Sequence, residues 1–368
     1  MRVASDYVVE RWSAAERRAA LGAVVLFVVL AAVPTLCSGQ VIDKLTTLFV
    51  YILLAAMWNL LSGYAGLVSV GQQAYFGVGA YFALRLVSFG IEPYPALLLG
   101  ALVAAAIAVP VSFFLLRLRD GEFAIASWVV AEVIRILVMF DFLVQGETGT
   151  SLIALNSYDP GWRLRATYWF ALVSLAGLLF VAFLLLRSRI GAAGQAIRDD
   201  EEAARSLGVN VMRTKQTIYV LAAFGCALAG VIWLASAITF LPRTNFGVQW
   251  TVFMLFMVLV GGLRTMEGPI LGAVIFFVLQ EGFGNYGVWY LFGIGIVAVV
   301  FALALPGGIW GAIHHRFGAR FFPVGERLVR RGVTADISQQ VLDGIAPQDG
   351  SLKMRPSAIE QNVSSERR

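Results

Sequence analysis

Residues 191–209 read GAAGQAIRDDEEAARSLGV and lie between two apolar stretches, 166–187 and 216–240. They form the longest polar interruption in the apolar part of the chain, and their composition predicts a helix. Of the 368 residues, 59% are hydrophobic and only 14% are charged. A soluble domain of this length cannot bury so much apolar surface, so we expect an all-α integral membrane protein.

Apolar stretches that can cross about 30 Å of hydrocarbon occur at about ten places. The predicted spans are 19–38, 45–62, 66–90, 95–116, 122–144, 166–187, 216–240, 249–264, 267–283 and 287–305. Glycine-rich interruptions at 62–66 and 261–269 indicate that some of these helices are discontinuous.

The positions of Lys and Arg predict the orientation. They concentrate in the N-terminal arm, at 117 and 119, in the 187–215 loop, at 264 and in the tail from 316, and ten alternating spans place all five on one side. The positive-inside rule assigns that side to the cytoplasm. We expect a cytosolic arm (1–18), a transmembrane domain (19–311) with a cytosolic loop at 187–215 and an outer loop at 145–165, and a mobile cytosolic tail (312–368).

Several function classes lack their residues. The chain has no G-x-x-x-x-G-K-S/T phosphate loop, and its histidines are only His314 and His315. Cys37 and Cys226 offer no metal-ligand spacing. We therefore expect no enzyme, no metal and no cofactor in this chain, and the clustered basic residues are better explained by topology than by nucleic-acid binding.

The 191–209 segment carries signals of a short helix. Asp199 or Asp200 can cap it, Glu201 and Glu202 suit its first turn, and Gly208 can end it. Ala203, Ala204 and Leu207 then form a small apolar stripe. The stripe fits a groove on a soluble partner, or it belongs to an ordinary amphipathic loop helix; periodicity alone leaves both readings open.

Six segments resemble, in order, the LivM-type permease subunits of branched-chain amino-acid ABC importers. They are LLSGYAGLVSVGQQAYFGVGAY (60–81), FAIASWVVAEVIR (123–135), GETGTS (146–151), QAIRDDEEAARSLGVNV (195–211), GGLRTMEGPILGA (261–273) and ALPGGIWG (304–311). The resemblance implies an importer permease architecture in the bacterial inner membrane. It also implies a second, LivH-like permease, two ABC ATPase subunits that bind ATP and Mg, and a periplasmic substrate-binding protein.

The family's cytoplasmic loop engages the ATPase, so the resemblance assigns that role to matching residues of this chain. These are Arg198, Asp199, Glu202, Ala203, Ala204, Leu207 and Gly208. The chain has Thr148-Gly149-Thr150 where the family more often has a TGG-type turn. Importers of urea and short-chain amides share the same signatures, so they are the alternative substrates.

Polar residues within the spans are candidates for the substrate path. Gln72, Gln73 and Tyr75 follow the glycine-rich break at Gly66 and Gly71, where free backbone N–H groups can meet a carboxylate; close helix packing through the glycines is the alternative.

Glu132 and Arg135 lie three residues apart and can neutralise each other, either as a structural pair or in gating. Thr148 and Gly149 of the outer loop complete the candidates. An ion-coupled secondary carrier is the rival class, and Glu132 is its only good acidic candidate.

Overall fold

The computed structural model describes residues 7–10, 14–305, 307–317 and 327–330. They fall into two units, a helical unit (12–325) and a small unit formed by the chain ends. In the small unit β1 (Tyr7–Glu10) pairs antiparallel with β4 (Arg327–Arg330). The tail predicted as mobile therefore contains a strand, while 1–6, 11–13, 318–326 and 331–368 of the predicted arm and tail lie outside the described residues.

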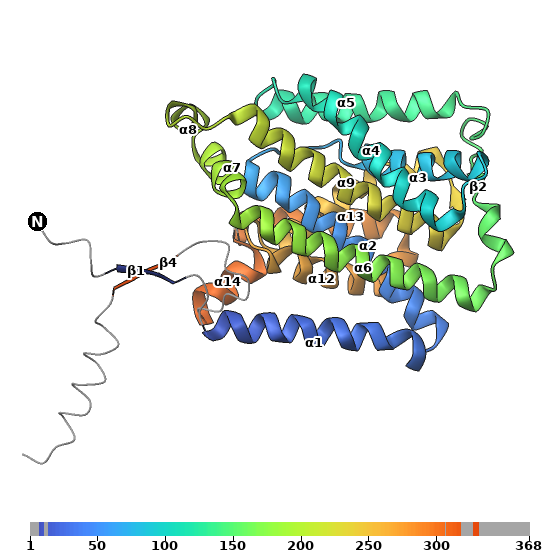
Figure 1. Cartoon of the computed structure of the whole chain (residues 1–368), viewed down its shortest axis with the longest axis horizontal. Coiled ribbons are helices and arrows are strands. Elements are labelled where there is room, and N and C mark those ends of the chain that lie inside the picture. Colours follow the sequence, from blue (N-terminus) through green and yellow to red (C-terminus); the bar gives the residue numbers. More distant parts are fainter. Residues whose placement is uncertain (1–6, 11–13, 306, 318–326, 331–368) are drawn as a thin grey trace, which may run out of the picture. The chain divides into compact units, whose positions relative to one another are not determined.

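Long helices run side by side through the helical unit (Figure 1). They are α1 (Ala14–Leu36), α2 (Gly39–Asn59), α3 (Gln73–Ser88), α4 (Pro93–Leu115), α5 (Asp120–Met139), α6 (Pro160–Arg187), α9 (Val211–Ala237), α11 (Gln249–Gly261), α12 (Glu267–Phe283) and α13 (Val288–Ala304). Each of the ten predicted stretches overlaps one of them. The prediction of an all-α, multi-pass membrane protein is confirmed.

Among the described residues, six helices are long and apolar enough to cross a membrane. They span Gly39–Tyr64, Pro93–Leu115, Pro160–Arg187, Val211–Ala237, Pro242–Gly261 and Val288–His314. Helices α3 and α12, with 16 and 17 residues, are shorter than a full span. The prediction of a continuous span over 66–90 is wrong, because the helix begins only at Gln73.

Two predicted boundaries also shift. Pro160 starts α6 and the Asp159 carboxylate accepts the Trp162 backbone N–H at 3.0 Å, so the outer loop ends before 160 rather than at 165. The transmembrane domain was predicted to end at 311, but α14 (Gly308–Phe317) extends beyond that residue. Residues 261–269 form a tight turn between α11 and α12 and not a discontinuity within one helix.

Helices α2 and α9 form the centre of the helical unit. Within the most apolar 18-residue stretch of each, 72% and 78% of the residues are buried. Small residues allow this packing: a Cβ atom on Gly230 would lie 1.9 Å from the Phe76 carbonyl oxygen, so α9 and α3 approach closely. Helices α1 and α5 lie along opposite edges (Figure 1).

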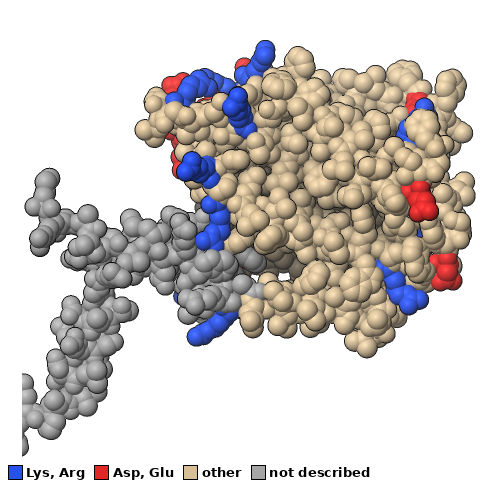
Figure 2. Space-filling view, viewed as in Figure 1, with Lys and Arg blue, Asp and Glu red and all other residues tan. Residues whose placement is uncertain are grey.

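The two ends of the helical unit differ in charge. Lys and Arg side chains gather at the end that carries α7 (Arg189–Asp199) and α8 (Glu201–Ser206), and the flank is almost free of charge on the face shown (Figure 2). At the opposite end β2 (Thr150–Ser151) pairs with β3 (Thr239–Phe240), beside the short helices η2 (Ile153–Ser157), α10 (Pro242–Asn245) and η3 (Gly284–Tyr286). An uncharged flank between polar ends suits a bilayer.

Candidate functional site

Residues 188–210, which we name the elbow, connect α6 to α9 through two short helices (Figure 1). Ser188 caps α7 and Asn210 caps α9. Between them Asp200 is extended, and its carboxylate accepts the backbone N–H groups of Glu202 and Ala203 at 2.9 Å each. The prediction of an aspartate cap is confirmed at Asp200, but one continuous helix over 191–209 is wrong, because the extended cap residue divides it.

The elbow has its own small core, in which Ile197, Ala204 and Val211 are buried together. Ala204 therefore packs inward and does not share the exposed face predicted for it. Ala203 is exposed and Leu207 is 85% exposed. Gly208 follows with φ +86°, the left-handed conformation expected at a helix end.

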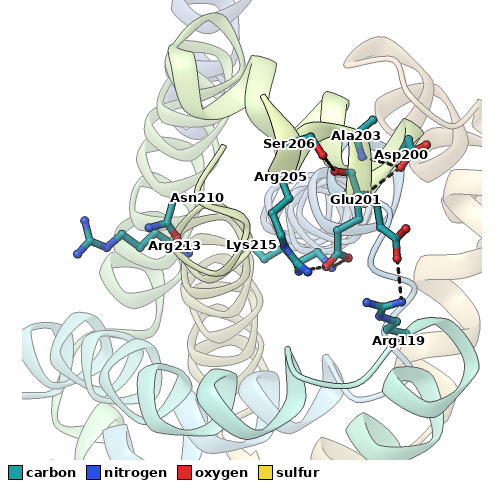
Figure 3. A network of polar contacts seen from close by, with 10 residues as sticks. Arg119, Asp200, Glu201, Ala203, Arg205, Ser206, Asn210, Arg213 and Lys215 are labelled. Carbon is teal, nitrogen blue, oxygen red and sulfur yellow. Dashed lines mark hydrogen bonds and ion pairs between the residues drawn. The ribbon is translucent and has the colours of Figure 1, made fainter. Parts of the chain in front are cut away.

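Glu201 holds the base of the elbow to α9. Its carboxylate pairs with the Lys215 ammonium at 2.5 Å and the Arg205 guanidinium at 2.9 Å, while Arg119 lies 3.7 Å from Glu202 (Figure 3). Partial burial alone would raise the pKa of Glu201, but the hydrogen bond and charge of Lys215, with Arg205 and Arg119, lower it below its ordinary value. The carboxylate is thus ionised at neutral pH.

Residues 60–72, which we name the break, interrupt the path from α2 to α3. A π-helical turn, η1 (Leu60–Tyr64), ends α2, and Gly66 has φ +72°. The Trp58 indole N–H donates to the Ser69 carbonyl at 2.9 Å, so the chain turns back along the last turn of α2. Helix α3 consequently begins inside the helical unit and, at 16 residues, rises about 24 Å, which is less than a full bilayer core.

Arg198 joins the elbow to the break. Its side chain is 16% exposed, and its guanidinium donates to the Gly63 carbonyl at 2.9 Å and to Asp199 at 2.7 Å. A Cβ atom at Gly66 would lie 3.1–3.3 Å from Arg198, so the two backbones are in close contact. The partly buried guanidinium therefore connects α7 directly to the end of α2.

Asn59 extends this connection to a third segment. Its amide nitrogen donates to the Thr265 carbonyl at 2.9 Å, and its amide oxygen accepts the Arg264 backbone N–H at 3.1 Å. Asn59 is 2% exposed, and both of its bonds are partly buried. The elbow, the break and the α11–α12 turn are thus linked by partly buried hydrogen bonds.

The structure brings four of the predicted path residues together at the break. Gly71 packs so closely that a Cβ atom would lie 2.1 Å from the Ser127 carbonyl oxygen of α5. Gln73 accepts a hydrogen bond from Thr251 of α11, and the Tyr75 and Tyr219 hydroxyls lie 2.9 Å apart.

Gln72 differs from its neighbours because it is fully buried, yet neither amide atom has a hydrogen-bond partner. An orphaned buried amide is costly, so this position calls for an explanation.

The other path candidates lie apart from the break. Glu132 and Arg135 pair at 2.9 Å on the half-exposed face of α5, and Arg135 also lies 3.4 Å from Glu147. Thr148 and Gly149 follow Glu147, and Gly149 (φ +75°) packs against the Phe240 carbonyl of β3. Arg135 therefore links α5 to the loop that follows it.

Sequence reasoning missed Asn59, Ser127, Lys215 and Thr251 as partners of the site. Asn59 and Lys215 could have been recognised, because each is a strongly polar residue at the edge of an apolar stretch. Ser127 and Thr251 could not, because their roles depend on which helices adjoin the break.

Comparison with known proteins identifies the family. The family profile described as "Branched-chain amino acid transport system / permease component" matches residues 40–313. The chain is 28% identical to the high-affinity branched-chain amino acid transport system permease protein LivM of Escherichia coli K12, over 78% of this chain and 73% of that protein. It is 22% identical to a probable LivM of Methanocaldococcus jannaschii, over 66% of this chain and 82% of that protein.

A more distant similarity joins the chain to a sugar importer. The ribose import permease RbsC of Escherichia coli K12 is 29% identical over 36% of this chain and 43% of that protein. No solved structure matches the chain. The profile covers most of the chain, including the break and the elbow, and confirms the resemblance drawn from the sequence segments. The chain belongs to the family of permease components of branched-chain amino acid transport systems.

Proposed function

We propose that the chain is the permease subunit of a bacterial ABC importer for branched-chain amino acids, and that separate subunits bind ATP and Mg and hydrolyse ATP. The observation that carries this proposal is the elbow. It exposes Leu207 and Ala203 on its outer surface and is anchored to the break on its inner side by Arg198. An exposed apolar knob on a firmly held base is suited to receive force from a partner.

The elbow offers the ATPase a mixed surface. Leu207 supplies apolar contact, while the Asp199 and Glu202 side chains, 68% and 79% exposed, supply charge around it. Gly208 ends α8 and leaves Leu207 at its tip. Arg198 and Ala204 face inward, so their role is to hold this surface in place.

Movement of the elbow would reach the transport path through contacts that are already made. The Arg198–Gly63 hydrogen bond would transmit a displacement of α7 to the end of α2. The hydrogen bond from Asn59 to Thr265 would transmit the displacement further to the α11–α12 turn. As the break shifts, the unpartnered Gln72 amide at its end would gain hydrogen-bond partners, and Gln73, the first residue of α3, would exchange its Thr251 partner. Access would then alternate across the bilayer.

The remaining subunits follow from the same proposal. A second, LivH-like permease would cover the half-exposed Glu132–Arg135 pair on α5, since a charge pair facing lipid is unfavourable. A periplasmic binding protein would deliver the substrate. The protein would lie in the inner membrane, and its basic end, which carries the elbow, would face the cytoplasm. Both chain ends would also lie on the cytoplasmic side.

Two alternatives are less well supported. An importer of urea or short-chain amides would use the same architecture. The relatives that match most of this chain, however, are branched-chain amino-acid permeases. An ion-coupled carrier needs a free acidic group on the path, and Glu132 is paired with Arg135.

The test is co-purification with the partner subunits in mild detergent. Leu207→Arg should abolish ATPase association while the chain still inserts in the membrane, and Arg213→Glu, an exposed charge change on the first turn of α9, should leave association intact. ATPase that stays bound to Leu207→Arg refutes the assignment. Uptake of labelled leucine, isoleucine or valine compared with urea then separates the substrates.

A further inference from the structure

A pocket of about 490 Å³ lies beside the elbow. One wall is the connection between α4 and α5, and the other is formed by α8 and the start of α9. The lining residues are Leu116, Arg117, Leu118, Arg119, Glu201, Arg205, Val209, Asn210, Val211, Met212 and Lys215. Residues of the α4–α5 connection and of α8 and α9 thus line one pocket that is partly open to solvent.

The lining is strongly basic. Arg117, Arg119, Arg205 and Lys215 carry positive charge, and Glu201 is the only acidic residue that lines the cavity. Figure 3 shows Arg205 and Lys215 converging on that single carboxylate, with Arg119 on the facing wall. One carboxylate cannot neutralise two cations.

The two arginines of the other wall are only weakly compensated by acidic groups. Arg119 makes an exposed contact to Glu202 at 3.7 Å, and such contacts contribute little; its charge also acts on Glu201 from farther away. Arg117 forms no ion pair with any side chain that the structure describes. The cavity therefore holds more positive charge than its own residues compensate.

The position of the cavity selects the kind of anion. It lies where the apolar helix α4 ends at Leu115 and where α9 begins at Val211, which is the depth of lipid headgroups for membrane-spanning helices. Apolar side chains of Leu116, Leu118 and Met212 stand beside the cations. A cationic site with an apolar wall at this depth fits a phosphate group with acyl chains attached.

We propose that this cavity binds the phosphate headgroup of an anionic phospholipid, with Arg117 and Arg119 on one wall and Arg205 and Lys215 on the other. A bound headgroup bridges the α4–α5 connection to α8. It would thereby hold the base of the elbow against the bundle, independently of any ATPase.

The test measures lipid binding to the full-length chain purified with its partner subunits in neutral detergent. Native mass spectrometry would count lipids retained after addition of phosphatidylglycerol or phosphatidylcholine. Inorganic phosphate and glycerol 3-phosphate serve as separate additions. We expect phosphatidylglycerol to be retained over phosphatidylcholine, and Arg117→Gln or Arg119→Gln to weaken it about tenfold, as for one lost charge-assisted hydrogen bond.

Arg213→Gln is the matched control, because it removes a charge from the same end of the molecule but does not line the cavity, and its side chain points away from the Glu201 cluster (Figure 3). Equal loss in this control, or equal binding of the two lipids by the wild type, overturns the proposal. Inorganic phosphate or glycerol 3-phosphate bound as tightly as phosphatidylglycerol overturns the lipid assignment. The readout needs no ATP, and ATPase association is scored in the same preparations, so the two proposals fail separately.

Discussion

The Arg198 guanidinium donates to the Gly63 carbonyl at 2.9 Å and so joins segments 135 residues apart in the chain. Gly63 lies in the π-helical turn that ends α2, and Arg198 lies in the last turn of α7. A carbonyl in a π-helical turn is available to a side chain because the regular helix ladder is interrupted. The exposed elbow and the buried break therefore meet at one charge-assisted bond.

Arg198→Ala should uncouple ATP hydrolysis from uptake. The docking surface around Leu207 remains, so ATPase association should persist, whereas uptake should fall about tenfold because a charged hydrogen bond is lost. The measurement is ATP hydrolysed per substrate transported. Arg189→Ala, at the exposed start of α7, is the control and should transport normally. Equal effects of the two variants would show that Arg198 has no special role.

Gly71→Ala should destabilise the protein by about 1–3 kcal/mol, the usual cost of overpacking. The new Cβ atom would lie 2.1 Å from the Ser127 carbonyl oxygen, and neither backbone can move without opening the break. Gly177→Ala on α6, where a Cβ atom meets nothing within 4 Å, is the control. Thermal unfolding in detergent compares the two, and an unchanged Tm for Gly71→Ala would contradict the packing at α5.

Gln72→Leu should separate stability from transport. Replacing a buried amide without partners by an apolar side chain of similar size removes a desolvation cost, so the thermal stability should stay equal or rise by about 1–3 kcal/mol. If the amide serves the path in another state, uptake should fall in the same variant. A Gln72→Leu variant that is less stable than the wild type, or that transports at the full rate, would exclude a role of the Gln72 amide in the transport path.

Glu201→Gln should loosen the elbow from α9, because it leaves Lys215, whose side chain is 9% exposed, without its counter-ion. The loss should be about 1–3 kcal/mol at neutral pH. Since folding lowers the pKa of Glu201, the wild-type advantage is complete above the unfolded value of about 4.3 and disappears as the pH falls through the folded value.

Unfolding temperatures of wild type and Glu201→Gln between pH 8 and pH 4 test this prediction. The difference between them should be constant from pH 8 to pH 6 and should shrink only at the acidic end. A difference that shrinks already near pH 7 would mean that Lys215 does not hold the carboxylate ionised.

The length and hydropathy of the apolar stretches predicted the ten helices, because a backbone in lipid must satisfy its own hydrogen bonds within each helix. The cap at Asp200 and the left-handed Gly208 were also predictable, since both depend on neighbouring residues. The separate helix α7 ahead of Asp200 was not, because residues 191–209 were read as one helix-forming stretch.

Tertiary contacts set the limits of the sequence reading. Ala204 was placed on the outer face by its spacing from Ala203, but the small core with Ile197 and Val211 draws it inward. The partners of Arg198 and Gln73 lie 135 and 178 residues away, and no local pattern indicates which carbonyl or hydroxyl they meet. Family resemblance located the elbow but not its bond to Gly63.

The proposed function requires that a separate ATPase acts on the elbow to drive transport, and uptake of labelled leucine into vesicles tests this most directly. The vesicles contain the chain with its second permease, binding protein and ATPase subunits. Uptake should require internal ATP and should cease in Leu207→Arg, while Arg213→Glu should transport normally. Full uptake by vesicles that hold this chain alone, without nucleotide, would contradict it.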